Sequence, residues 1–256
     1  MLRTIKAVLN YTLKATDKKL GSVKDFYFDD HMWVNRYLVA DTGNWLPGRQ
    51  VLIGTEALGQ PDWHQEVFPI HLTAEQIEQS PDIKDDAPVS LQQEEKLRAY
   101  FSWQKYWDDQ SFIQPAAGSE FAIVGACPPL EAVPADVVTA FHVPSGDPHL
   151  RSVNEVCGYS IQVLDGSIGQ VEDFVMDDTT WKLQYLIVDT GNWLPGKKVL
   201  ISPEWIKQVS WADQNVDLDL TQEGVKSSPE FDPSLPINRE YEARLYDYYG
   251  RPKYWS

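Results

Sequence analysis

Cysteine is scarce in this sequence. Only Cys127 and Cys157 occur in 256 residues, and neither lies in a Cys-x-x-Cys or Cys/His spacing typical of a metal site. The sequence therefore predicts neither a disulfide framework nor a zinc centre. We interpret both thiols as structurally passive, and Cys157 as a small buried apolar group.

Long apolar runs and basic residues are also scarce. No run approaches the length that a bilayer requires, and the first residues lack the apolar core of a secretory signal. We therefore expect a cytoplasmic protein without membrane insertion. Lys and Arg number 22 against 38 Asp and Glu, which gives a formal net charge of −16. A nucleic-acid partner is not expected, because such a molecule repels phosphate backbones.

Signatures of catalysis are missing as well. The sequence holds no phosphate-binding glycine loop, no nucleophile elbow and no zinc-hydrolase motif. Its five histidines are not placed beside a nucleophile at a recognisable spacing. We expect no enzymatic activity, no catalytic residues, no cofactor and no metal site.

Tryptophan and tyrosine, by contrast, are abundant, with 10 and 12 residues. Aromatic side chains are enriched at protein interfaces as well as in cores. One tryptophan lies in the octapeptide Asp-Thr-Gly-Asn-Trp-Leu-Pro-Gly, which occurs at 41–48 and again, unchanged, at 189–196. An apolar run precedes each copy and Val-Leu-Ile follows it. This pattern predicts a β-hairpin with Trp-Leu at its tip.

The repeat extends far beyond the hairpin. A shift of 148 residues aligns 1–108 with 149–256 without a gap, and about a third of the aligned positions are identical. We interpret the chain as a tandem duplication. The predicted domains are residues 1–108 and 149–256, and residues 109–148 form a linker rich in Pro and Ala.

Short strands are expected to dominate each domain. In the first copy, the apolar patterns predict strands over 12–15, 23–28, 36–40, 51–53 and 67–72. So many short strands in one domain predict a mainly β fold, a small barrel or sandwich. Thr73 is expected to cap a single helical turn. Helices predicted over 90–102 and 238–249 give each domain a short helical and aromatic C-terminal extension that packs on its own barrel.

The sequence resembles PRC-barrel proteins. The resemblance is carried by Gly21, the Asp-Phe pair, the Tyr-Leu-Val run, the octapeptide and the Val-Leu-Ile segment that follows it. The resemblance covers residues 5–80 and 153–228. The family is named after the cytoplasmic domain of the photosynthetic reaction-centre H subunit, and the C-terminal domain of a ribosome-maturation factor shares its fold. The resemblance implies two small PRC-type β-barrels whose work is protein contact.

The hairpin tips have two interpretations. In one, the Trp and Leu of each tip fold back over the open end of their own barrel. In the other, they are contact anchors for a protein partner, and the basic residue that follows forms a polar rim. The residues of this candidate interaction site are Trp45, Leu46, Arg49, Trp193, Leu194 and Lys197.

The duplicated aspartates also have two interpretations. Asp41 and Asp189 are expected to accept backbone N–H bonds in their own turns rather than act in catalysis. The pairs Asp29-Asp30 and Asp177-Asp178 suggest a cation site, but further ligands at alternating positions are missing. We interpret these pairs as solvated turn residues.

Two functions follow from these patterns. The first is a non-enzymatic protein-interaction or scaffold protein whose two barrels pack as a pseudo-symmetric pair. Its partner is a protein of unknown identity or a second copy of the chain. The second is an acidic protein that handles cations or protons, peripherally associated with a membrane electron-transfer complex like the reaction centre.

Overall fold

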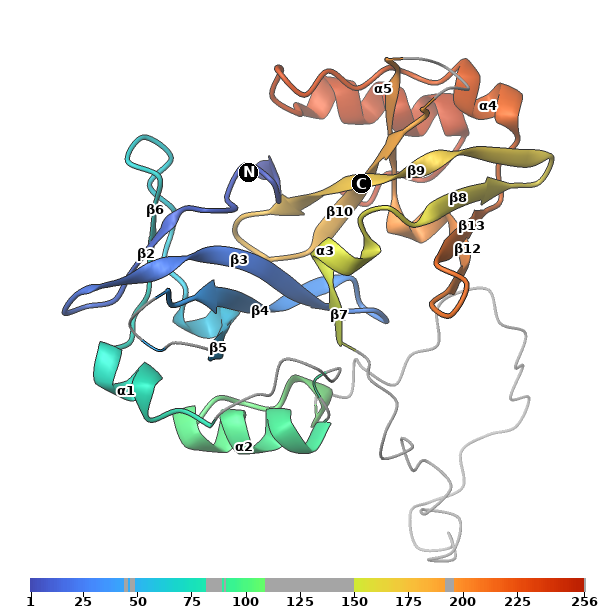
Figure 1. The fold of residues 1–256 in the computed structure, drawn as a ribbon. Coiled ribbons are helices and arrows are strands. Elements are labelled where there is room, and N and C mark those ends of the chain that lie inside the picture. Colours follow the sequence, from blue (N-terminus) through green and yellow to red (C-terminus); the bar gives the residue numbers. More distant parts are fainter. Residues whose placement is uncertain are drawn as a thin grey trace, which may run out of the picture. The chain divides into compact units, whose positions relative to one another are not determined.

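The computed structural model describes residues 1–43, 46, 49–81, 89, 91–108, 150–191 and 196–255. The chain forms two compact units, one of Met1–Asp85 with His149–Ser256 and the other of Asp86–Pro148. Within the described residues the protein is mainly β, and both of its sheets belong to the first unit (Figure 1). The predicted linker, residues 109–148, lies outside the described residues.

The first sheet has six strands in the order β5-β4-β3-β2-β6, and β7 pairs with β3. Neighbouring strands are antiparallel except β2 and β6, which are parallel. The strands are β2 (Thr12–Lys14), β3 (Lys19–Asp29), β4 (Val34–Asp41), β5 (Gln50–Gly54), β6 (Val67–Pro69) and β7 (Leu150–Ser152). The strands predicted for the first copy are thereby confirmed, with shifts of a few residues at their ends.

The second sheet has seven strands in the order β11-β10-β9-β8-β13-β12, and β1 pairs with β9. Here β8 and β13 are the parallel pair. The strands are β1 (Leu2–Thr4), β8 (Ser160–Val163), β9 (Gly166–Asp177), β10 (Leu183–Asp189), β11 (Lys198–Ile201), β12 (Ile206–Ser210) and β13 (Asn215–Leu218). The order of the main strands follows that of the first sheet.

The long strands β3 and β9 form the centre of the two sheets. Phe26 and Phe28 in β3 and Phe174 in β9 are fully buried, because these strands place large apolar side chains on the core face. Gly21 in β3 and Gly169 in β9 have φ of +153° and +133°, and a β-carbon at either would overlap the backbone carbonyl at the end of the next strand. Only glycine permits this close crossing of the strands.

Short helices follow each sheet, as the sequence predicts. Thr73 caps α1 (Ala74–Glu78) through a capping box, and Asn238 caps α5 (Arg239–Tyr249), which ends at Gly250. The predicted helix over 90–102 is α2 (Leu91–Phe101), in the second unit. The remaining helices are α3 (Val153–Val156) and α4 (Gln222–Lys226), with 3-10 turns η1 (Thr55–Ala57), η2 (Tyr106–Asp108) and η6 (Pro203–Trp205).

The aromatic tail after α5 packs back on the elements that precede it. Tyr246 of α5 lies 5.3 Å from both Trp205 and Trp255, measured between ring centroids. Glu242, only 2% exposed, accepts hydrogen bonds from Tyr185 of β10 and from Tyr254, each at 2.8 Å. The prediction that this tail packs on its own domain is confirmed for the second copy.

Strands β1 and β7 each pair with the sheet formed by the other end of the chain, an exchange that the sequence patterns do not predict. For brevity, residues 1–81 are called the N-half and residues 150–255 the C-half. Strand β1 of the N-half pairs with β9. Strand β7 of the C-half pairs with β3 (Figure 1). The two halves of the first unit are therefore joined by exchanged strands.

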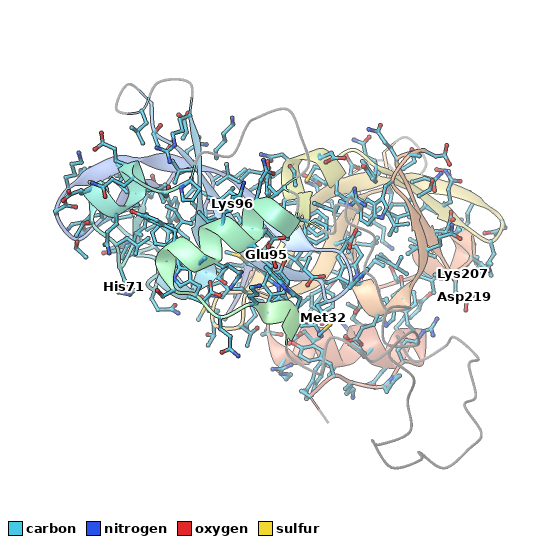
Figure 2. All side chains as sticks on the ribbon, turned by 90° about the horizontal axis from the view of Figure 1, so that it is seen from below. Met32, His71, Glu95, Lys96, Lys207 and Asp219 are labelled. Atoms are coloured by element: carbon cyan, nitrogen blue, oxygen red, sulfur yellow. The ribbon has the colours of Figure 1, made fainter. Side chains whose placement is uncertain are left out.

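The surface of the described residues carries scattered large apolar side chains. Met32, labelled in Figure 2, is 41% exposed, and Leu164 and Leu235 are each 63% exposed. Separately, none of the helices in the described part of the chain combines the length and the apolar character needed to cross a bilayer.

Candidate interaction site

The two octapeptide loops begin with the same turn. Asp41 accepts a hydrogen bond from the backbone N–H of Gly43 at 2.9 Å, and Asp189 accepts one from Gly191 at 2.8 Å. Both glycines have a left-handed backbone conformation, with φ of +54° and +55°, which glycine adopts without strain. The prediction that these aspartates bind their own turns is confirmed.

A buried threonine then ties the two sides of each loop together. Thr42, 4% exposed, donates its hydroxyl to the carbonyls of Leu46 at 3.0 Å and Arg49 at 3.3 Å. Thr190, 1% exposed, donates to the carbonyl of Lys197 at 2.7 Å. Each loop base is thus closed by side-chain bonds in addition to the strand pairing.

A cation binds each loop base to the short helix that follows the strands of its sheet. The Arg49 guanidinium donates to the carbonyl of Glu78 at 2.5 Å and to that of Ser80. The Lys197 ammonium donates to the carbonyls of Lys226 at 2.5 Å and Ser228 at 2.8 Å. These carbonyls lie at the C-terminal ends of α1 and α4, where helices leave such groups without internal partners. Burial lowers the pKa of Lys197.

The structure thus describes half of the predicted interaction residues. Leu46 is half-buried, and Arg49 and Lys197 are anchors of the loop bases. Trp45, Trp193 and Leu194 lie outside the described residues. A role of these six residues in partner contact stays a prediction.

The threonine and serine anchors were not singled out by sequence reasoning. Thr42, Ser80 and their equivalents 148 residues later are identical in the two copies. That identity is the signal by which they could have been found. Without the fold, nothing indicates that residues some thirty positions apart bond to one another, and identity alone does not distinguish an anchor from a contact residue.

A second repeated feature lies where the halves meet. The Asp25 carboxylate accepts hydrogen bonds from the backbone N–H of Asn154 at 3.1 Å and from the Ser152 hydroxyl at 2.5 Å. Asp173, its counterpart, accepts from the backbone N–H of Lys6 at 3.2 Å. Both carboxyls are at most 6% exposed. Burial raises the pKa of Asp25, and it raises the pKa of Asp173 to about 6.

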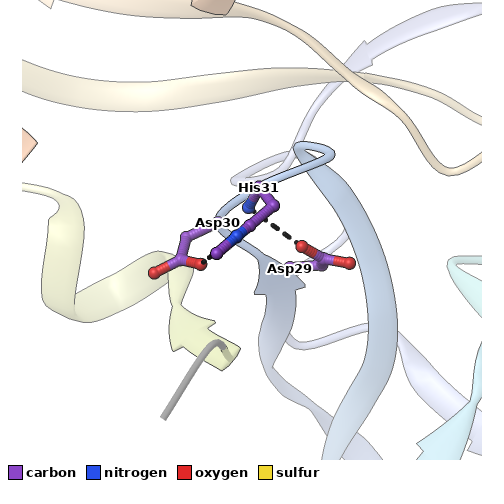
Figure 3. A group of neighbouring side chains, drawn as sticks. All are labelled: Asp29, Asp30 and His31. Atoms are coloured by element: carbon purple, nitrogen blue, oxygen red, sulfur yellow. Dashed lines mark hydrogen bonds and ion pairs between the residues drawn. The ribbon is translucent and has the colours of Figure 1, made fainter. Parts of the chain in front are cut away.

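The acidic pair at the end of β3 is the candidate metal site. Asp29, Asp30 and His31 place ligand atoms within 4.8 Å of one another. Figure 3 shows these three side chains at the turn after β3. Asp29, however, pairs with Arg36 at 3.1 Å, and Asp30 pairs with Arg151 at 3.0 Å. Each carboxylate therefore already has a cationic partner.

The interpretation of the acidic pairs as solvated turn residues is wrong for two of them. Asp29 is fully buried, and Asp178 is 6% exposed. Asp29 caps its turn by accepting from the backbone N–H groups of His31 and Met32, and Asp177 does the same for Thr179 and Thr180. The turn assignment holds, but the neighbouring half removes solvent from it.

Cys157, which the sequence predicts as a buried apolar group, is a free thiol that is only half-buried. Burial raises the pKa of Cys157 to about 12, so the thiol stays protonated at neutral pH. Cys127 lies outside the described residues, as do His142 and His149.

Comparison with known proteins adds one finding to this geometry. Residues 150–222 match the family model of the PRC-barrel domain. The PRC-barrel match begins at β7 and ends at the start of α4, so it includes the second octapeptide loop, Asp173 and Lys197. A search of curated proteins gives no match. The predicted PRC-barrel resemblance is thereby confirmed for the C-half.

The buried carboxyl of Asp173 predicts a pH dependence of stability. Because its pKa is about 6 when folded and 3.8 ordinarily, the folded protein holds a proton that the unfolded chain has released between these values. The free energy of unfolding should therefore fall as the pH rises from 4 to 6, by at most about 3 kcal/mol. Asp25 acts in the same direction.

Urea denaturation of the wild type and Asp173→Asn across this pH range measures the effect. Asparagine keeps an acceptor for the N–H groups of Lys6 and Phe174 but does not ionise. The variant should therefore show a flatter pH dependence. Asp219→Asn, a change in an exposed side chain labelled in Figure 2, serves as control. Equal pH dependence in Asp173→Asn and the wild type would contradict the assignment.

Proposed function

We propose that this protein is a non-enzymatic protein-interaction or scaffold protein, built from two PRC-type β-barrels that arose by tandem duplication. The PRC-barrel match in the C-half and the sequence identity between the halves support this origin. The protein acts in the cytoplasm and binds a protein partner without entering a membrane.

The observation that carries the proposal is the matched anchoring of the two octapeptide loops. Each loop base is held by an aspartate turn, a buried threonine and a cation bound to helix-end carbonyls. A loop base held in this way needs no further ordering when a partner binds, which suits the display of a contact residue. The tryptophan in each loop is the proposed anchor for the partner.

The proposal predicts that the loop tryptophans hold the partner. Affinity capture from native lysate is compared for the intact chain and for Trp45→Ala/Trp193→Ala, with the melting temperature checked in both. The double variant should recover at least about tenfold less of the partner, as expected when contact anchors are removed.

A matched control removes exposed apolar side chains elsewhere. Leu164 and Leu235 are each 63% exposed, and Leu164→Ala/Leu235→Ala should leave capture unchanged. If the tryptophan variant stays folded and recovers the partner as well as the intact chain does, the loops are not the docking site. Their tryptophans then cover the barrel ends instead.

One observation favours the alternative function, a proton-handling protein at a membrane electron-transfer complex. The carboxyl of Asp173 changes protonation near pH 6, close to physiological pH. The same capture experiment separates the two proposals. Recovery of subunits of such a complex, more strongly at pH 6 than at pH 8, would favour the alternative.

A further inference from the structure

The exchanged strands are bonded in the same register in both directions. In one direction Leu2 pairs with Asp177, and Thr4 pairs with Val175. In the other, Leu150 pairs with Asp29, and Ser152 pairs with Tyr27. Each residue in the first set of pairs lies 148 positions from its counterpart in the second set. The two exchanged strands therefore make equivalent backbone pairings with the opposite half.

Side-chain contacts across the junction follow the same rule. The Asp173 carboxylate accepts a hydrogen bond from the backbone N–H of Lys6. The Asp25 carboxylate accepts one from the backbone N–H of Asn154, the residue equivalent to Lys6. The strand that crosses is also fixed to its own half by a stacked arginine. Arg3 lies 4.3 Å above the Trp63 ring, and Arg151 lies 4.3 Å above the Trp211 ring.

The centre of the junction is formed by the turns after β3 and β9. The N–H of Asn35 donates to the carbonyl of Trp181 at 2.9 Å, and the N–H of Leu183 donates to that of Trp33 at 2.7 Å. Val34 and Lys182, which are equivalent positions, bridge to one another. A contact in which equivalent residues meet is the mark of a two-fold, self-complementary interface.

Such an interface does not require both halves to come from one chain. If the N-half of one molecule pairs with the C-half of another, and the reverse, every contact described above forms twice. The only difference is whether the two halves that residues 82–149 connect contact one another or contact the halves of the second molecule. The balance between one chain closed on itself and two chains exchanged then depends on the effective concentration that this segment provides.

We infer that the junction between the halves is also an assembly interface, through which two copies of this chain form a strand-exchanged dimer. In this dimer the N-half of one chain pairs with the C-half of the other. Pairing two C-halves would instead place the Lys182 side chains of both chains against one another, and their like charges would repel. It presents four octapeptide loops in place of two. This inference rests on the junction contacts and does not depend on what the loops bind.

Refolding of the full chain at low and at about hundredfold higher concentration tests it. Light scattering after size exclusion should show monomer from the dilute sample and a dimer fraction from the concentrated one. Inserting about 70 flexible Gly/Ser residues within 109–148 should raise the dimer share about threefold at a given concentration, because a connecting segment of twice the length lowers the effective concentration of one half for the other.

A cysteine pair identifies which surface holds the dimer. Thr4→Cys/Val175→Cys places two thiols opposite one another across β1 and β9, in a chain with Cys127→Ser and Cys157→Ala. After oxidation and denaturation, the dimer fraction should run as linked pairs and the monomer fraction as single chains. Thr4→Cys alone should give neither cross-link.

Two results would overturn the inference. The first is a chain that remains monomeric at every concentration, with and without the insertion. The second is a dimer fraction that separates into single chains after oxidation, which would mean that another surface holds it. If the cysteine variant does not fold, the molar mass of the insertion variant still tests the inference. Loss of partner capture in the tryptophan variant leaves this outcome unaffected.

Discussion

Replacing Gly169 with alanine is expected to lower the free energy of unfolding by about 3 kcal/mol or more. The added β-carbon would overlap the backbone carbonyl of Asp189, which cannot move without breaking the pairing of β9 and β10. The φ of +133° adds strain that only glycine avoids. Equilibrium denaturation in urea, monitored by tryptophan fluorescence, measures the loss.

Gly191→Ala separates the steric overlap from the cost of the backbone angle. Gly191 also has a positive φ, +55°, but a β-carbon there meets nothing within 4 Å. Its replacement should cost only about 1 kcal/mol. If the two variants lose equal stability, the close crossing of strands at Gly169 is not what requires glycine.

Replacing Glu242 with alanine is expected to cost about 2–4 kcal/mol and to release helix α5. The carboxylate accepts from Tyr185 and Tyr254 at 2.8 Å and pairs with Arg239 at 3.1 Å. Tyr185 is fully buried, so its hydroxyl would lose its acceptor away from water. Hydrogen exchange should rise across residues 239–255, since this carboxylate links the tail to β10.

The matched control lies in the same turn of the helix. Glu240 is exposed, and Glu240→Ala should change stability by less than about 0.5 kcal/mol. Glu242→Gln keeps one acceptor oxygen and should give an intermediate loss. Unchanged exchange rates in α5 of the Glu242→Ala variant would show that packing of Tyr246 and Trp255 suffices to hold the tail.

Much of the local structure is predictable from the residues alone. Thr73 caps its helix as expected, because capping depends on bonds within one turn. Asp41 and Asp189 bind the N–H two residues later for the same reason. The strand positions also follow from apolar residues that recur over a few positions.

The candidate site was predictable only in part. Identity between the copies marks the loops, but it does not tell that Arg49 and Lys197 bind helix-end carbonyls some thirty residues away. A basic residue after a turn is equally compatible with a solvated rim. Which of these occurs depends on where α1 and α4 lie, and that is decided by packing of the whole domain.

The sequence by itself determined the short strands and their turns, because these depend on neighbouring residues, and it showed that the octapeptide occurs twice. Only the tertiary structure decided where Leu2–Thr4 and Leu150–Ser152 pair. A strand of only three residues does not specify which sheet it pairs with, so its partner is determined by long-range packing. The same exchange buries Asp25 and Asp173, since each carboxyl finds its partners on the other half.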